Sequence, residues 1–189
     1  MKDRTGASEG NFGGYENRLT SAEAVMNTEA EKDAKDEFDN SFEVPLPPDH
    51  AWRVLSDIRR IASSIPGVKL TDVVDDRTYQ GTISVALGPA ALTFASLVKL
   101  EEIDPVNHTA RLQAQGTAAN GRGAARGTVS FRLEPRNGGS KVLVHTDLVL
   151  SGPAAQYGRR LETVHDTAAQ IMSQFAANLR EQVAGSAGP

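Results

Sequence analysis

The sequence predicts an α+β domain in which a curved antiparallel sheet wraps around one long C-terminal helix. Six strand-like segments follow one another between residues 68 and 150, and short breaks rich in Asp, Asn, Gly and Pro separate them. Such breaks favour antiparallel hairpins over helical crossovers. Apolar residues recur at helical spacing before and after this block. The chain of 189 residues suits one domain of about 150 residues plus an appendage.

The distribution of charge divides the chain into two parts. Residues 1–37 contain five Lys/Arg and nine Asp/Glu, a net charge of −4, whereas residues 38–189 contain 15 of each. The first part is also rich in Gly, Asn and Glu and poor in large apolar side chains, so we expect a disordered acidic tail. We therefore assign residues 1–37 to the tail, residues 38–184 to the ordered domain and residues 185–189 to a flexible C-terminus.

The ordered domain is predicted to begin with a strand and then one bent helix or two short helices. Phe38, Phe42 and Val44 share one face of an extended segment, which the following prolines end. An apolar stripe at +3 spacing then predicts the helical region, which Pro66 and Gly67 terminate. The stripe consists of Trp52, Leu55, Ile58 and Ile61.

The remaining elements are six strands and the long helix. A clean apolar stripe over about residues 153–183 predicts this helix. The stripe contains Tyr157, Leu161, Val164, Ala168, Ile171, Met172, Phe175 and Leu179. The strand segments are Val68–Val74, Thr78–Leu87, Leu92–Ile103, Thr109–Ala119, Gly123–Glu134 and Lys141–Leu150.

Small residues cluster on the inward faces of two neighbouring strands. Glycine and alanine weaken strands, so their clustering requires a reason. If they face the long helix, they leave volume that larger side chains would fill, and the domain then encloses an apolar cavity. The alternative is that the helix packs closely against small residues. The residues concerned are Ala110, Ala114, Gly116 and Ala118 beside Leu112, and Gly123, Ala125 and Gly127 before Val129.

The cavity interpretation predicts which side chains bind a ligand. The helix stripe should face the small-residue patch, one amphipathic strand should close a wall, and two residues should lie near the mouth. The helix contributes Leu161, Val164, Ala168 and Phe175; the patch Leu112, Ala114, Gly116, Gly127 and Val129; the wall Leu92 and Phe94; and the mouth Trp52 and Ile65.

Other classes of site find little support in the sequence. There is no cysteine, so Cys-ligated metals and disulfides are excluded. Glu162 and His165 have the spacing of half a di-iron site, but no second copy exists, and we expect neither a metal nor a catalytic constellation. The neutral body argues against nucleic acid, and no apolar run is long enough to span a bilayer.

Ordered motifs across residues 39–183 resemble the G-subunit family of carbon monoxide dehydrogenase. The segments FEVPLPPDHAWRVLSDIRRIASSIPGV, YQGTISVALGPAALTFASLVKLEEIDP, GRGAARGTVSFRLEP and AAQYGRRLETVHDTAAQIMSQFAANL carry these motifs. The resemblance implies a helix-grip fold of the START and Bet v 1 kind, with seven strands, two short helices and a long helix enclosing an apolar cavity. It also implies an accessory, non-enzymatic role with a molybdenum-containing CO dehydrogenase or related hydroxylase.

Three functions follow as expectations. The first is a carrier of a hydrophobic small molecule, such as an isoprenoid quinone or a lipid, that links a CO dehydrogenase-like complex to the membrane and needs no metal or covalent cofactor. The second is an assembly or membrane-recruitment factor that acts by protein contacts alone. The third is an enzyme of the aromatase/cyclase kind, which would need ionisable groups in the cavity. A carrier would be cytoplasmic, with peripheral contact at the inner face of the cell membrane.

Overall fold

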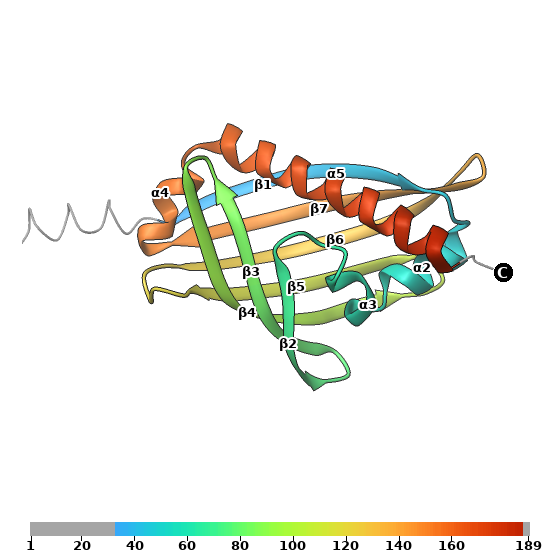
Figure 1. Cartoon of the computed structure of the whole chain (residues 1–189), viewed down its shortest axis with the longest axis horizontal. Coiled ribbons are helices and arrows are strands. Elements are labelled where there is room, and N and C mark those ends of the chain that lie inside the picture. Colours follow the sequence, from blue (N-terminus) through green and yellow to red (C-terminus); the bar gives the residue numbers. More distant parts are fainter. Residues whose placement is uncertain (1–32, 187–189) are drawn as a thin grey trace, which may run out of the picture.

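The computed structural model describes residues 33–186, which form one seven-stranded antiparallel sheet and four helices around it (Figure 1). The strand order is β1-β7-β6-β5-β4-β3-β2, so the first and last strands along the chain are neighbours. The helix α5 lies along the sheet, and α2 and α3 cover the end near its C-terminus. The strands are β1 Ala34–Val44, β2 Val68–Asp75, β3 Thr78–Leu87, β4 Ala90–Asp104, β5 Thr109–Ala118, β6 Ala124–Arg136 and β7 Gly139–Ser151.

The expected α+β helix-grip architecture is confirmed, with strand limits within four residues of those predicted. The first strand begins at Ala34, not at Phe38, because residues 34–37 continue the antiparallel ladder with β7. This extension also turns Asp36 toward α5, where its carboxylate contacts His165. The expected tail lies outside the described residues up to position 32, as do residues 187–189.

The predicted helical region before β2 consists of two short helices, α2 (Pro48–Leu55) and α3 (Ile58–Ala62). Asp57 separates them, because its carboxylate accepts a hydrogen bond from the Arg60 backbone N–H and caps the second helix. The Ile65-Pro66-Gly67 turn then leads into β2. Gly67 has a φ of 79° and faces the Ser84 backbone so closely that a Cβ would collide with it.

The C-terminal helical region is divided, whereas the sequence predicted one continuous helix. A 3₁₀ turn η1 (Gly152–Ala154) and a single turn α4 (Ala155–Gly158) precede α5 (Leu161–Ser186). Gly158 ends the single turn in close contact with the sheet, since a Cβ there would lie 2.9 Å from both the Ala34 Cβ and a Leu150 methyl group. The short helix α4 therefore packs against β1 and β7 through Gly158, and α5 begins three residues later.

The two halves of α5 contact the sheet differently. In the C-terminal half, Phe175 and Leu179 are buried in the main apolar core, which extends over α2, α3 and the sheet. Polar contacts add to this packing, because Arg180 donates two hydrogen bonds to the Glu43 carbonyl and Asn178 donates one to the Ser64 carbonyl. A second, smaller core near α4 contains Phe94 and Leu150. In the N-terminal half of α5, Val164 is buried but belongs to neither of these two cores.

Glycines allow the strands to approach one another where the sheet bends. A Cβ on Gly81 would lie 2.5 Å from the Lys69 carbonyl oxygen of the neighbouring strand, and a Cβ on Gly116 would lie 2.6 Å from the Ser96 hydroxyl and 3.0 Å from the Phe94 Cβ. Real Cβ atoms do not approach oxygen atoms this closely. Both glycines therefore maintain the curvature that keeps β2, β3 and β4 folded toward α5.

We predict that Gly81→Ala lowers the free energy of unfolding by about 1–3 kcal/mol, the usual cost of overpacking, because β2 must move away from β3. Gly185→Ala is the matched control, since a Cβ there meets no atom within 4 Å and the residue lies in a helix. Urea denaturation of both variants measures the difference. Equal stability of the two variants would show that Gly81 is not required for the bend.

Candidate functional site

The sheet and the N-terminal half of α5 border an apolar cavity of about 240 Å³ that is partly open to solvent. Val164, Ala168 and Ile171 line it from the helix, and inward side chains of β1, β3, β4, β5, β6 and β7 line the rest. Inward positions alternate with outward ones along each strand. Most of the inward residues here are aliphatic or aromatic, so methyl groups and rings form the cavity walls. The strands contribute Phe38, Ile83, Val85, Leu87, Phe94, Ala114, Ala125, Gly127, Val129, Leu148 and Leu150.

A second apolar cavity of about 120 Å³ lies beside α2 and α3. Phe42, Leu112, Phe131 and Phe175 are among its walls, and Ile65 of the Ile-Pro-Gly turn closes it from the helical side. Val129 and Ile171 line both cavities. These two side chains therefore form the partition between a larger cavity near α4 and a smaller one near α3.

Ten of the thirteen residues that the sequence assigned to a ligand line one of these cavities. Phe94, Ala114, Gly116, Gly127, Val129, Val164 and Ala168 line the larger one, and Ile65, Leu112 and Phe175 line the smaller one with Val129. The apolar stripe of the helix thus faces the small-residue patch as predicted. The sequence predicted a single cavity between them, whereas the structure has two.

Three of the predicted residues are not among the lining residues. Trp52 is 8% exposed and packs against Phe131 and His108 in the main core, so it does not lie at a mouth. Leu92 packs against the second core. Leu161 begins α5, and its side chain is outside the described part of the structure.

The small residues around the larger cavity fall into two groups, which differ in whether a larger side chain would fit. Gly116 and Gly127 both lie close to neighbouring strands; a Cβ on Gly127 would be 3.1 Å from the Asp147 carbonyl oxygen. Close packing therefore explains the absence of a side chain at these two positions. Ala114 and Ala168 carry a Cβ and still border the cavity. The alanines are consequently the positions at which a longer side chain would enter the cavity.

Two polar contacts fix the N-terminal half of α5 to the strands on either side of the cavity. The Thr167 hydroxyl donates a hydrogen bond of 3.0 Å to the Ala86 carbonyl of β3. On the other side, His165 Nε2 lies 2.9 Å from Asp36 Oδ2 of β1, and the side chain of Asp36 is only 10% exposed. The ring of His165 also contacts Phe38, with centroids 5.3 Å apart. Sequence reasoning missed Asp36 because it assigned this residue to the tail.

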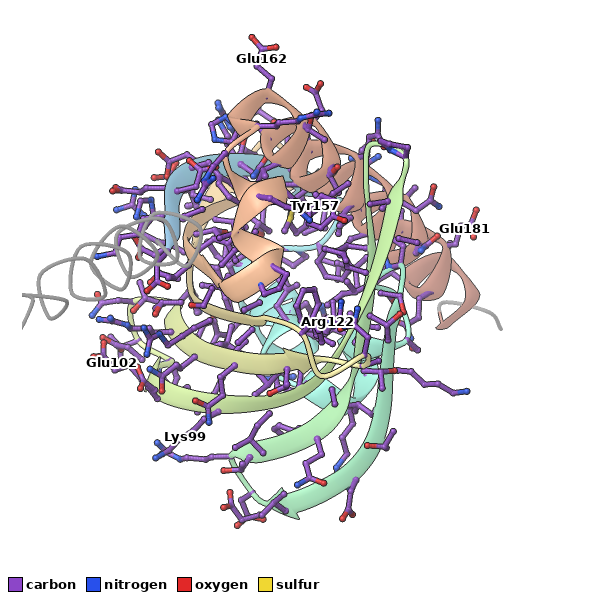
Figure 2. All side chains as sticks on the ribbon, turned by 90° about the vertical axis from the view of Figure 1, so that its left-hand side faces the viewer. Lys99, Glu102, Arg122, Tyr157, Glu162 and Glu181 are labelled. Carbon is purple, nitrogen blue, oxygen red and sulfur yellow. The ribbon has the colours of Figure 1, made fainter. Side chains whose placement is uncertain are left out.

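The polar side chains of the protein are directed mainly away from the cavity. Figure 2 shows Lys99 and Glu102 on the outer side of the sheet and Glu162 pointing away from α5. Glu162 and His165 therefore do not form a shared site, since His165 contacts Asp36 instead. The polar residues that border the cavity are Ser96, Thr146, Thr167, Gln115 and Arg126, and the last two are exposed. No carboxylate or histidine is among the described residues that line it.

The outer face of the sheet carries wider, open hollows. One of them, of about 600 Å³, is lined by residues of β3, β4, β5 and β6, including the exposed Gln80, Gln115 and Arg126. Its walls mix amides, hydroxyl groups and one guanidinium with a few apolar side chains. Such a surface does not enclose a hydrophobic molecule, and the inner cavities remain the candidate ligand site.

The curved sheet, the long helix and the apolar interior define a protein with the helix-grip fold. The chain belongs to the CoxG family of carbon monoxide dehydrogenase subunits, whose model matches residues 41–184. None of the curated protein sequences compared with the chain matches it significantly.

Solved structures support the fold. A conserved protein from Geobacillus kaustophilus is similar with a TM-score of 0.68 and 18% identity, over 80% of this chain and 97% of that one. An aromatase/cyclase from a Streptomyces species gives a TM-score of 0.52 with 16% identity, over 78% and 93% of the two chains. Norcoclaurine synthase from Thalictrum flavum gives 0.53 with 13% identity, over 80% and 95%. At these identities the likeness establishes the fold alone.

Among the described residues, no helix is both long enough and apolar enough to cross a membrane.

We predict that Ala114→Leu leaves the free energy of unfolding unchanged or raises it, because the added methyl groups enter the larger cavity. Ala110→Leu is the matched control: it lies on the same face of β5, is 5% exposed and lines neither cavity. There the same change should overpack the core and cost about 1–3 kcal/mol. Chemical denaturation compares the two. Equal destabilisation would mean that the region around Ala114 is fully packed.

Proposed function

We propose that this protein is a non-enzymatic carrier that binds a hydrophobic molecule with a long apolar chain, such as an isoprenoid quinone or a lipid. The observation that supports this most directly is the cavity between α5 and the sheet, whose walls are aliphatic and aromatic side chains. Transfer of an apolar chain from water into such walls is favourable by roughly 25 cal/mol per Å² buried. Few polar groups border the cavity, so it suits the chain of a ligand better than a polar head.

The dimensions of the two cavities suggest how a long chain is accommodated. The larger cavity, at about 240 Å³, is smaller than the roughly 300–1,000 Å³ typical of ligand sites. A long chain would therefore extend past Val129 and Ile171 into the cavity beside α3. Ile171 lies on α5 and is half-buried, so a change of its side-chain rotamer, or a small outward shift of the helix, would connect the two cavities.

The family name suggests the partner. As a member of the CoxG family of carbon monoxide dehydrogenase subunits, the protein would act with a CO dehydrogenase-like oxidoreductase. A carrier that holds a quinone could collect it at the membrane and present it to this enzyme, or return its reduced form. Peripheral contact with the cytoplasmic face of the membrane is part of this proposal.

An alternative is recruitment of the enzyme by protein contacts alone. The observation in its favour is the charged outer surface, which includes exposed arginines on β6 and just before α5. An enzymatic function of the aromatase/cyclase kind has less support, because acid–base chemistry requires ionisable groups at the ligand. Arg126 is the ionisable residue among those that line the cavity, and it is exposed on the outer face of β6. Neither Asp36 nor His165, which contact each other, lines the cavity.

We expect the purified protein to bind a short-chain quinone saturably and Ala114→Leu to bind it at least tenfold more weakly, because the leucine occupies the cavity. Ala95→Leu is the control, since Ala95 is exposed on the outer face of the same sheet. Quinone titration followed by intrinsic tryptophan fluorescence, together with mass spectrometry of organic extracts, gives the readout. Absence of any lipid-like ligand and of quinone binding would refute the carrier proposal.

The same pair of variants separates the carrier from the recruitment factor. A carrier variant with a filled cavity should still be captured by a CO dehydrogenase-like complex but should no longer transfer quinone to it. If the filled variant supports quinone reduction by the complex as well as the unmodified protein does, protein contacts alone account for the function.

We also predict that Ile171→Ala increases the affinity for long-chain quinones relative to short-chain ones. The substitution shortens one of the two side chains that separate the cavities, so a longer chain gains apolar contacts that a short chain cannot reach. The measurement is the ratio of dissociation constants for quinones with one and with several isoprene units. A ratio identical to that of the unmodified protein would show that the ligand does not pass between the cavities.

A further inference from the structure

The outer face of β1 and β7 carries four side chains with metal-binding potential at adjacent positions of the ladder. Glu37 of β1 pairs in register with Asp147 of β7, and Asp39 pairs with His145. All four point away from α5, because the inward positions of β1 are Asp36 and its even-numbered neighbours. The group is therefore separate from the cavities and lies on the opposite side of the sheet.

The histidine is the centre of this group. Its Nδ1 lies 2.8 Å from Asp39 Oδ1. Its Nε2 lies 3.3 Å from Glu37 Oε1 and 3.7 Å from Asp147 Oδ1. The ligand atoms offered by Glu37, His145 and Asp147 lie within 4.8 Å of one another. One side of the ring thus contacts a single carboxylate, and the other side faces two.

This arrangement places like charges opposite each other. Glu37 and Asp147 are direct cross-strand neighbours, and two carboxylates in that relation repel. The His145 ring is the cationic group that lies at ion-pair distance from these two carboxylates and from Asp39. Its hydrogen bond to Asp39 and the surrounding carboxylates raise the pKa of His145. Even a protonated ring compensates only one of three negative charges.

We propose that Glu37, Asp147 and Nε2 of His145 bind a divalent cation of the zinc type. Asp39 would accept the Nδ1–H hydrogen bond, which fixes the tautomer that leaves the Nε2 lone pair toward the metal. Metal-bound histidines generally have such an orienting carboxylate on their second nitrogen. One imidazole and two carboxylates suit Zn²⁺, whereas Mg²⁺ and Ca²⁺ favour sites built from oxygen alone.

The site would have open coordination positions toward solvent. The side chain of His145 is 38% exposed, and those of Glu37 and Asp147 are 70% and 53% exposed. Three protein ligands leave at least one position of a tetrahedral ion for water or for a group from another molecule. A cation here would also bridge the edge strand β1 to β7, which would add a link between the beginning of the domain and its last strand.

The test uses the full chain purified without a histidine tag and treated with a chelator. Isothermal titration calorimetry with Zn²⁺ at neutral pH should show saturable binding of one ion per chain. His145→Asn should abolish it, and Asp39→Asn should weaken it by about 10–100-fold, as expected for an orienting residue. His50→Asn is the control, because His50 is an exposed histidine outside the group. All four side chains of the group are solvent-accessible, so the variants should fold normally.

Two further readouts make the test decisive. Because Zn²⁺ must displace the proton from Nε2, the apparent affinity should fall at mildly acidic pH. In nitrogen-15 spectra of labelled histidine, Zn²⁺ should shift Nε2 of His145 and leave Nδ1 protonated. Mg²⁺ should not shift Nε2. Absence of saturable Zn²⁺ binding, or equal binding by the unmodified protein and His145→Asn, would overturn the proposal. Neither result depends on the function of the cavities.

Discussion

The unequal packing of α5 against the sheet is the constraint on which the rest of the structure depends. The C-terminal half of the helix is fixed by buried Phe175 and Leu179 and by two hydrogen bonds from Arg180 to the Glu43 carbonyl. The N-terminal half lies over alanines and glycines and reaches the strands through Thr167 and His165. The C-terminal half is therefore packed into the main core, while the N-terminal half borders a space that the protein's own side chains do not fill.

The sheet supports this arrangement through its curvature. Gly81 and Gly116 permit contacts with neighbouring strands that a side chain would prevent, so β2, β3 and β4 turn toward the helix and close the side of the cavity. Successive side chains of each strand point to opposite faces of the sheet, so the two faces can have different chemical character. The inner face is apolar and suited to a hydrophobic ligand, whereas the outer face carries the His145 group and charged pairs such as Arg132–Glu134.

Patterns within one segment predicted most of the fold, because the periods of strands and helices are local properties; the limits of Thr78–Leu87 agree with the structure. Features that depend on contacts between distant segments were missed. A large aromatic residue such as Trp52 can lie at a cavity mouth or in a core. Its contact with Phe131 of β6 shows that it lies in the core, and the sequence does not reveal this contact. The close contact of Gly158 with β1 and β7 is another such feature. The sequence alone did not connect His145 with Glu37, because the two residues are far apart in the chain and meet only where β1 pairs with β7. Glu37 also lies in the segment whose charge indicated a disordered tail.

The unfilled volume beside α5 also bears on why a ligand is expected there. Side chains that border unfilled space lose packing contacts that a filled core would provide, and the larger cavity of about 240 Å³ is such a space. Alanines at positions 114 and 168, where longer side chains would have room, therefore reduce the stability that the protein's own residues could provide. A bound apolar chain would supply the missing contacts, and its binding would stabilise the folded state in proportion to its occupancy.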